Sequence, residues 1–565
     1  MSNKQVIIKH QLSRLGLVLL VLAALAAVLV WRAWDLHVIQ HDFLAGEGAK
    51  RNTRIQPLTA YRGVIKDRDG RPLAVSTPVT TLWGEPSELL ENKEAWQRLK
   101  GNPVLSEEEL AKRVHLYRNR SYVYLARRLA PSQAQSVLSK NIPGIYTETE
   151  YRRYYPAGEV AGHLVGFTNI DDRGQEGLEL MLDERLNGIS GRKKVVRDLK
   201  GRVIQDIEVQ KEARPGEDIE LSIDLRLQYI AYRELKAAVE KYQAAGGSVV
   251  VLDARTGEVL AMVNQPGFNP NSRAGVSISA LRNRALTDLF EPGSTIKPLT
   301  IAAGMEAGTV TRDTVIDTTP GTMRIGRDTV RDFRNYGVMD IPTVLAKSSN
   351  VATSKIALEL DQQALPALMG RFGLGMTTGI GFPGEAAGNL PFRHNWREIE
   401  TATLSYGYGV SVTALQLARA YGVIANNGMQ LPVTLFKREK APAGEQIIAA
   451  EYANALVTML EGVVSEGTAS GARVPGYRIA GKTGTVRKLI NGSYGAGRYL
   501  AMFAGIAPVE DPRIVTVVVV DDPRSGVYYG GLVAAPVFAS IMQAVLPMLN
   551  IEPEEKPLVA QRGHL

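Results

Sequence analysis

A hydroxyl and an amine stand at a spacing that suits nucleophilic catalysis in the segment FEPGSTIK, residues 290–297. Residues three apart on a helix share one face, so the Lys297 amine can reach the Ser294 hydroxyl. At the first turn of a helix, Ser294 also meets free N–H groups and the positive end of the helix dipole. Because an oxyanion formed there is stabilised, the pattern predicts a serine nucleophile served by a lysine.

Two further motifs follow in the same half of the chain. Ser348-Ser349-Asn350 places a hydroxyl and an amide two residues apart in a helical stretch. Lys482-Thr483-Gly484-Thr485 lies in an expected strand, where a glycine lets the backbone of a substrate approach closely. We expect these residues to complete the site around the serine.

Each motif alone is a weak signal, and the chain contains a decoy for two of them. Ser190 and Lys193 repeat the serine–lysine spacing in a polar loop, and Ser139 and Asn141 repeat the serine–asparagine spacing. The motifs at Ser294, Ser348 and Lys482 differ from these decoys in their placement. They occur in order at a helix start, in a helical stretch and on a strand, all within one expected domain. Three chance tripeptides do not explain that placement, so we interpret the set as catalytic.

Other catalytic chemistries find no support in the sequence. The 565 residues include no cysteine, which excludes thiol nucleophiles, disulfides and iron–sulfur clusters. No G-x-S-x-G surrounds Ser294 and no histidine lies near it in sequence, so a Ser-His-Asp triad is not expected. His37 and His41 have a metal-like spacing but lack the glutamate of H-E-x-x-H, and a solvated helix face explains them. We predict neither a metal nor a cofactor.

Composition is ordinary for a globular protein. Hydrophobic residues make up 45% and charged residues 22% of the chain. The net charge of +8 reflects 66 basic against 58 acidic residues, without a long basic run, so nucleic-acid binding is not expected.

The N-terminus is predicted to be a membrane anchor. A basic tail, residues 1–14, precedes an uncharged apolar run from Leu15 to Trp31, and we assign residues 15–35 to a transmembrane helix. The alternative is a signal peptide cleaved near residues 24–26, but the apolar run continues beyond that site. The basic flank predicts a cytoplasmic N-terminus and a periplasmic remainder, in a single pass of the inner (cytoplasmic) membrane.

The remainder is predicted to divide into three parts. Residues 36–220 form a non-catalytic domain, residues 221–552 a catalytic domain, and residues 553–565 a polar tail. Within the first of these, residues 84–142 show helical patterns rich in Leu, Ala, Glu and Arg.

The expected catalytic domain has strands at both of its ends and helices between. Helices are expected at 224–243, 294–307 and 531–549, and strands at 247–253, 258–264, 477–486, 500–509 and 513–522. An antiparallel sheet with flanking helices is an α+β plan.

From about residue 15 to residue 550 the chain resembles the class B penicillin-binding proteins. The three catalytic motifs match the active-serine signature of that family in type and order. Arg62–Ala74, Arg152–Phe167 and Arg173–Glu179 resemble its non-catalytic motifs, which implies an α+β pedestal domain of the dimerisation type before the transpeptidase fold. Asn350 and the segment Tyr406–Ala418 resemble the cell-division members more than the elongation members.

The resemblance implies a role for each motif residue. Ser294 would attack a D-Ala–D-Ala carbonyl, Lys297 would be the general base, and Ser348, oriented by Lys482, would pass the proton to the leaving amine. Asn350 would bind the amide on the acyl side. Contacts to the substrate carboxylate and the oxyanion would come from Thr483, Gly484, Thr485 and the Ser294 N–H. Five tyrosines are candidates for lining the cleft, with ordinary packing as the alternative: Tyr406, Tyr408, Tyr499, Tyr528 and Tyr529.

The implied activity is a D,D-transpeptidase that cross-links peptidoglycan stem peptides at the septum. Implied partners are these peptides, their lipid-linked precursor, β-lactams, the membrane and other membrane proteins of the division machinery. The alternatives are an elongation-type transpeptidase, a D,D-carboxypeptidase or β-lactamase-like hydrolase, a penicillin-sensing receptor and a catalytically silent scaffold. A hydrolase does not need so large a pedestal, a receptor would show several spans before its sensor domain, and a scaffold has no use for Lys297.

Overall fold

The computed structural model describes residues 3–197, 203–490 and 493–553. Most of the predicted tail, residues 554–565, therefore lies outside the described residues. The chain forms two compact units. Unit 1 comprises Met1–Tyr61, Pro78–Tyr151 and Gly188–Pro215, and unit 2 comprises Arg62–Thr77, Arg152–Asn187 and Gly216–Leu565.

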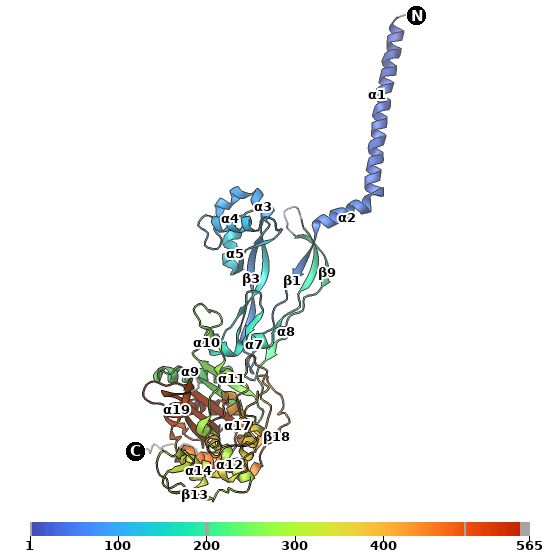
Figure 1. Cartoon of the computed structure of the whole chain (residues 1–565). Coiled ribbons are helices and arrows are strands. Elements are labelled where there is room, and N and C mark those ends of the chain that lie inside the picture. The colour runs from blue at the N-terminus through green and yellow to red at the C-terminus, as the bar shows by residue number, and fades with distance from the viewer. Residues whose placement is uncertain (1–2, 198–202, 491–492, 554–565) are drawn as a thin grey trace, which may run out of the picture. The chain divides into compact units, whose positions relative to one another are not determined.

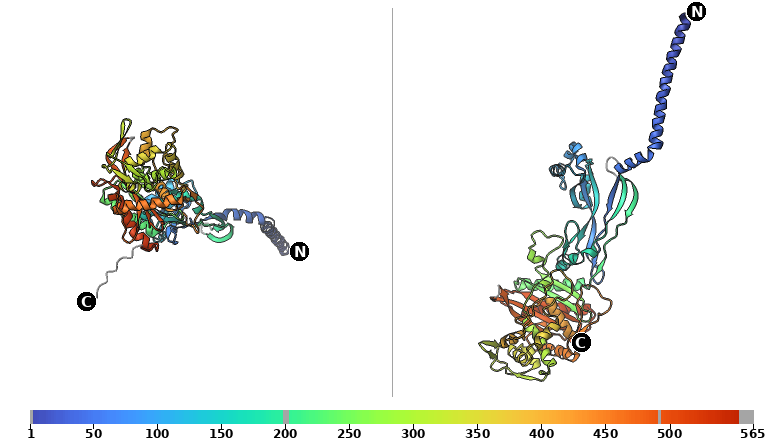
Figure 2. Two further views of the ribbon diagram at one scale, coloured as in Figure 1. Left: turned by 90° about the horizontal axis from the view of Figure 1, so that it is seen from below. Right: turned by 45° about the vertical axis from the view of Figure 1, so that its right-hand side comes forward.

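Unit 1 begins with a long apolar helix, α1 (Asn3–Trp34), which runs without a break in Figures 1 and 2. A π-helical turn (Asp35–Ile39) and α2 (His41–Asn52) follow it. The stretch Leu12–Ile39 has a mean hydropathy of 2.5, and none of it is buried within the structure. Exposed leucine and valine side chains over this length are what a bilayer covers, so this N-terminal helix is suited to be a membrane anchor.

The rest of unit 1 contains a small sheet and a helical cluster. Strands β1 (Thr53–Leu58), β8 (Gly191–Arg197) and β9 (Val203–Lys211) form an antiparallel sheet in that order. A separate core gathers the short helices α3 (Pro86–Glu91), α4 (Glu107–Leu116) and α5 (Pro131–Leu138).

One segment of unit 1 differs from the sequence prediction. The stretch 84–142 was predicted as helical, but it contains strand β4 (Val123–Leu129), which pairs with β3 (Pro72–Gly84). The last five residues of β4, Leu125–Leu129, favour helix, yet Val123 and Leu125 are buried and Tyr124 between them is exposed. This alternation buries one face of the segment, and tertiary packing overrides the propensity.

Unit 2 is built on a five-stranded antiparallel sheet in the order β12-β11-β21-β20-β19. The strands are β11 (Gly246–Asp253), β12 (Val259–Gln265), β19 (Ala480–Ile490), β20 (Ser493–Ala507) and β21 (Ile514–Asp521). All five strands that the sequence predicts here are confirmed, and so is the antiparallel α+β plan.

Helices cover both faces of this sheet (Figure 1). Helices α9 (Leu225–Lys241) and α19 (Gly530–Met548) pack against each other and the sheet, and α17 (Ala414–Ala425) packs against β11 and β21. A Cβ at Gly247 would meet Leu235 of α9, whereas Leu252 lies against Gly422 of α17. Odd and even strand residues point to opposite faces, so α9 and α17 cover different sides.

Unit 2 also includes two segments of the predicted pedestal, Arg62–Thr77 and Arg152–Asn187. Here the buried guanidinium of Arg62 pairs with Glu179 at 2.6 Å, and Arg153 pairs with the same carboxylate at 2.6 Å. The linear domain boundary near residue 220 stays a prediction.

Candidate active site

The Ser294 motif occupies a tight turn before a buried helix. The turn is a 3-10 helix, Gly293–Ile296, and α12 (Lys297–Glu306) follows directly. Gly293 has a φ of +53°, and a Cβ there would lie 2.3 Å from a methyl group of Val486. Only glycine accepts both the backbone conformation and this approach to β19. Ser294 itself is half-buried at the start of the helix.

A second glycine loop holds this turn from the other side. The Gly293 N–H donates to the Gly407 carbonyl at 3.1 Å. Gly407 has a φ of +84°, and a Cβ there would lie 2.2 Å from the Gly293 oxygen. The buried Tyr421 hydroxyl donates to the Thr295 carbonyl at 2.8 Å. The position of the serine is therefore fixed by backbone contacts on both sides.

The two predicted lysines converge on the Ser348 hydroxyl. Lys297 Nζ lies 3.1 Å from Ser348 Oγ, 2.5 Å from the Ser348 carbonyl oxygen and 2.8 Å from Asn350 Oδ1. Lys482 Nζ lies 2.9 Å from the same Ser348 Oγ. The structure thus brings together side chains from α12, β19 and the segment between α13 (Ile341–Lys347) and α14 (Asn350–Glu359).

Ser348 adopts an unusual backbone conformation at this point. It ends α13 with a φ of +61°, in the left-handed region that residues with a side chain rarely enter. Such strain persists only where the surroundings hold it, and it gathers at functional sites.

Burial lowers the affinity of both lysines for a proton. Both side chains are fully buried. Burial, with a smaller effect of the nearby Lys482, lowers the pKa of Lys297 well below its usual value. Burial alone lowers the pKa of Lys482 to about 7. A neutral amine is thus available near neutral pH, as a general base requires.

Asp332 is a site residue that sequence reasoning missed. Its carboxylate accepts hydrogen bonds from Ser349 Oγ at 2.6 Å and from the backbone N–H groups of Asn350 and Val351 at 2.6 and 3.0 Å. It therefore holds the first turn of α14, and its charge partly opposes the lowering of the Lys297 pKa. Nothing in the sequence singles it out, because a loop brings it to the helix.

The Lys482–Thr485 motif lies on edge strand β19, beside the serine turn. A Cβ at Gly484 would lie 3.0 Å from Thr295 Cγ2 and 3.1 Å from the Pro292 oxygen, so glycine permits this packing. Thr485 Oγ1 accepts a hydrogen bond from the Gly530 N–H at 2.9 Å, and Thr483 Oγ1 lies 3.0 Å from Thr468 Oγ1.

The five predicted tyrosines form two separate groups. Tyr406 and Tyr408 contact each other edge to face at 5.7 Å, and Tyr494, which was not predicted, contacts Tyr408 at 6.0 Å. Tyr499 and Tyr528 stack at 3.9 Å, and Tyr529 lies 4.6 Å from Tyr528. Their role as cleft lining stays a prediction.

The decoy motifs belong to a different part of the molecule. Ser190 and Ser139 lie in unit 1, and both side chains are exposed, whereas the catalytic set lies in unit 2.

One group of carboxylates among the described residues is close enough to hold a cation. Asp67, Asp69 and Asp224 form it, and each of the three already pairs with an arginine. Arg71 pairs with Asp67 and Asp69, and Arg226 pairs with Asp224 at 2.6 Å.

The fold and the active-serine motifs define a class of protein. Residues 247–543 match the penicillin-binding protein transpeptidase domain, and residues 57–221 match the penicillin-binding protein dimerisation domain. The chain belongs to the penicillin-binding protein family.

Similar proteins are known across nearly the whole length. The peptidoglycan D,D-transpeptidase FtsI of Escherichia coli K12 is 42% identical over 95% of this chain and 92% of its own. The probable peptidoglycan D,D-transpeptidase PbpC of Pseudomonas aeruginosa is 40% identical over 97% of both chains.

Solved structures show the same relationship. Penicillin-binding protein 3 of Mycobacterium tuberculosis, in complex with aztreonam, is 29% identical with a TM-score of 0.69, over 89% of this chain and 99% of that one. The transpeptidase domain of penicillin-binding protein 3 from Burkholderia pseudomallei is 43% identical with a TM-score of 0.55, over 60% of this chain and 98% of that one.

Proposed function

We propose that this protein is a peptidoglycan D,D-transpeptidase that works through an acyl-enzyme on Ser294 and cross-links stem peptides at the division septum. The observation that carries the chemistry is the Ser348 hydroxyl, which lies between two buried lysines of lowered pKa. The names of the E. coli and P. aeruginosa relatives support the reaction, and the name FtsI supports the division role.

Acylation follows from these positions. Neutral Lys297 removes the proton of Ser294, whose Oγ attacks the carbonyl of the penultimate D-Ala. The N–H groups of Ser294 and Thr485 stabilise the oxyanion. Ser348 donates a proton to the departing amine of the terminal D-Ala and regains one from the lysine pair. The ester bond to Ser294 has then replaced the peptide bond.

Substrate contacts come from the neighbouring motifs. Asn350 binds the amide on the acyl side. The Thr485 hydroxyl accepts from Gly530 and so keeps its own proton to donate to the substrate carboxylate. Thr483 and the Lys482 cation add to that anion site, and Gly484 keeps the strand free of a side chain there.

Deacylation distinguishes the proposed function from its alternatives. In a transpeptidase an amine of a second stem peptide attacks the ester and forms a new peptide bond, whereas a carboxypeptidase or β-lactamase uses water. Incubation with a donor pentapeptide and an amine acceptor should give a cross-linked product by mass spectrometry. Release of D-Ala without that product would favour a hydrolase.

The nucleophile is tested by labelling. Ser294→Ala should abolish the covalent mass increase after incubation with penicillin, because no other group attacks the lactam. Ser190→Ala is the matched control, since it removes the decoy serine, and should label fully. Labelling that survives Ser294→Ala would mean that the nucleophile is misassigned.

Topology and setting complete the proposal. The basic residues in the first part of α1, before its apolar run, support a cytoplasmic N-terminus and a periplasmic catalytic unit. A reporter fused after residue 40 should be active only outside the cytoplasmic membrane, and cytoplasmic activity would overturn this orientation. Anchored there, the enzyme meets lipid-linked precursors and other division proteins. Cells depleted of this protein should elongate without dividing. Depletion of an elongation-type enzyme would instead block elongation and leave division in place.

A further inference from the structure

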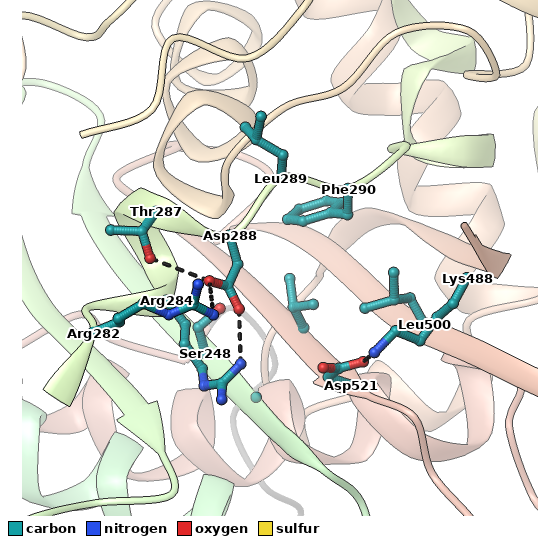
Figure 3. A pocket seen from close by; sticks show the side chains of 12 residues that line it. Ser248, Arg282, Arg284, Thr287, Asp288, Leu289, Phe290, Lys488, Leu500 and Asp521 are labelled. Carbon is teal, nitrogen blue, oxygen red and sulfur yellow. Dashed lines mark hydrogen bonds and ion pairs between the residues drawn. The ribbon is translucent and has the colours of Figure 1, made fainter. Parts of the chain in front are cut away.

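A cavity of about 390 Å³ lies in unit 2; Phe290, the first residue of the FEPGSTIK segment, lines it, but no residue assigned to the reaction does. Its floor is the sheet, with residues from β11, β19, β20 and β21, and its wall is the segment that leads from α11 (Arg284–Thr287) toward the serine turn (Figure 3). The volume is in the range of small-molecule sites.

Charged groups stand on two sides of this cavity. Asp288 accepts from Arg284 at 2.8 Å and pairs with Arg282 at 3.0 Å, so two guanidinium groups share one carboxylate. On the other side Lys488 pairs with Asp521 (Figure 3). Three cations against two carboxylates leave one positive charge, which a monoanionic ligand would balance.

One hydroxyl that lines the cavity makes no hydrogen bond with the described residues. Ser248 is only 4% exposed and lines the floor. Within the described part of the chain, no hydrogen bond of its hydroxyl is present. A Cβ at Gly246, two residues earlier on β11, would lie 3.6 Å from Arg284 Nε, so Ser248 points to the same side as the guanidinium groups. Because this hydroxyl lines the cavity and makes no bond within the described protein, it is available to donate to a bound acceptor.

Between the charged sides the lining is apolar. Leu289 and Phe290 come from the wall and Leu500 and Val519 from the sheet. We propose that this cavity binds a small amphipathic carboxylic acid. Its carboxylate accepts from Arg282, Arg284 and the Ser248 hydroxyl, and its apolar body lies over Phe290 and Leu500.

N-Acetyl-L-leucine is a suitable probe, because it joins one carboxylate to one branched apolar body. With the full-length chain in dodecyl maltoside micelles, saturation-transfer NMR should show binding in the millimolar range. N-Acetyl-L-leucinamide, which has the same body without the charge, should not bind detectably. Equal binding of the amide would overturn the proposal.

Variants locate the binding. Arg282→Gln should weaken binding of the acid about tenfold, as loss of a charge-assisted contact does. Arg371→Gln is the matched control, because Arg371 is similarly exposed and pairs with a carboxylate outside the cavity. The affinity of this variant for the acid should stay unchanged. Ser248→Ala should weaken binding without lowering the melting temperature, since the lost hydroxyl has no partner in the free protein. Unchanged affinity in Arg282→Gln and Ser248→Ala would refute the assigned contacts.

The catalytic cleft is the competing location for the probe. Acylation of Ser294 by penicillin fills that cleft, so binding of the probe should persist after complete acylation. Loss of the probe signal on acylation would place the probe in the active site and overturn the proposal. Because this measurement needs no turnover, it is independent of whether the proposed transpeptidase reaction is correct.

Discussion

Two lysines that share one hydroxyl determine how this site depends on pH. Both are fully buried, and Ser348 Oγ lies about 3 Å from each ammonium position. Two cations this close, without bulk water, disfavour each other, so at neutral pH one of the pair gives up its proton first. Burial lowers the pKa of Lys297 well below its usual value, and its position next to Ser294 in sequence assigns it as the neutral base, with Lys482 as the cation that orients Ser348.

The rate of acylation by penicillin should therefore fall above pH 7. Lys482 has a lowered pKa of about 7, so it carries its charge below that pH and loses it above. The second-order acylation rate reports the free enzyme and should show this limb. Lys482→Arg is the comparison: arginine stays charged, so its overall rate should be lower but level from pH 7 to 9. An alkaline limb at the same pH in the variant would show that another group titrates.

At the scale of the element, Asp332 links a helix start to catalysis. Asp332→Asn removes the charge from a carboxylate that accepts three hydrogen bonds at α14, and we expect a loss of about 1 kcal/mol in unfolding free energy from the weaker bonds and the lost helix-dipole interaction. That carboxylate also opposes the lowering of the Lys297 pKa. Without this carboxylate the pKa of Lys297 falls further. The acylation rate falls at acid pH because Lys297 becomes protonated, so this fall should move to lower pH.

The control for this prediction is another helix cap. Asp340 caps α13 by accepting from the Thr343 N–H at 3.0 Å, and its side chain is exposed. Asp340→Asn removes the same charge from a helix start and should lose about 0.5 kcal/mol of unfolding free energy, measured by urea unfolding, but leave the acylation rate at acid pH unchanged. Equal shifts in both variants would mean that Asp332 acts only on stability.

The glycine loop at 407–409 offers a second matched pair. Both glycines have a positive φ, so alanine at either costs about 1 kcal/mol in backbone strain. Only at Gly407 would the new Cβ collide with the backbone of Gly293; at Gly409 nothing lies within 4 Å. Gly407→Ala should slow acylation about a hundredfold by displacing the serine turn, and Gly409→Ala should change it little. If stopped-flow measurements gave similar acylation rates for Gly407→Ala and Gly409→Ala, the loop would not position the serine.

The sequence predicts the elements of unit 2 better than their connections. The five strands were predictable because valine-rich runs such as β21 need burial. The order of three individually weak motifs predicted one site, and the structure brings Lys297, Ser348 and Lys482 together. Asp332 could not be predicted, because it lies 17 or more residues before its partners at the start of α14 and only the tertiary fold brings it there. Strand β4 was missed for a related reason: its burial, set by packing in unit 1, overrides residues that favour helix.

At the scale of the whole molecule, context separates two apolar helices. Both α1 and α19 are long and apolar enough to span a membrane, with mean hydropathies of 2.5 and 1.7 in their most apolar stretches. Half of that stretch in α19 is buried against the sheet of unit 2, whereas none of it in α1 is buried. Helix α19 is therefore a core element, whereas α1 has no protein surface to cover its apolar side chains. Chemistry and membrane attachment therefore lie in different parts of the chain.

Removing the anchor should separate location from catalysis. Every residue assigned to the reaction lies after residue 290, in unit 2, and residues 1–40 contribute no group to it. A chain that lacks residues 1–40 should be soluble and should react with penicillin at a rate close to that of the full chain. Exported into the periplasm without its anchor, it should fail to support septation, because tethering raises the effective concentration of membrane-bound substrate and partners.

The two measurements are independent, and each can contradict the argument. A folded, soluble chain that penicillin does not acylate would mean that the anchor contributes to the active site. A soluble chain that restores division in a cell depleted of the full protein would mean that the anchor is dispensable. The matched control is the same soluble chain fused to an unrelated transmembrane helix. If α1 supplies attachment alone, that fusion should restore division. If α1 also contacts a membrane partner of the division machinery, the fusion should acylate at the normal rate and still fail to divide the cell.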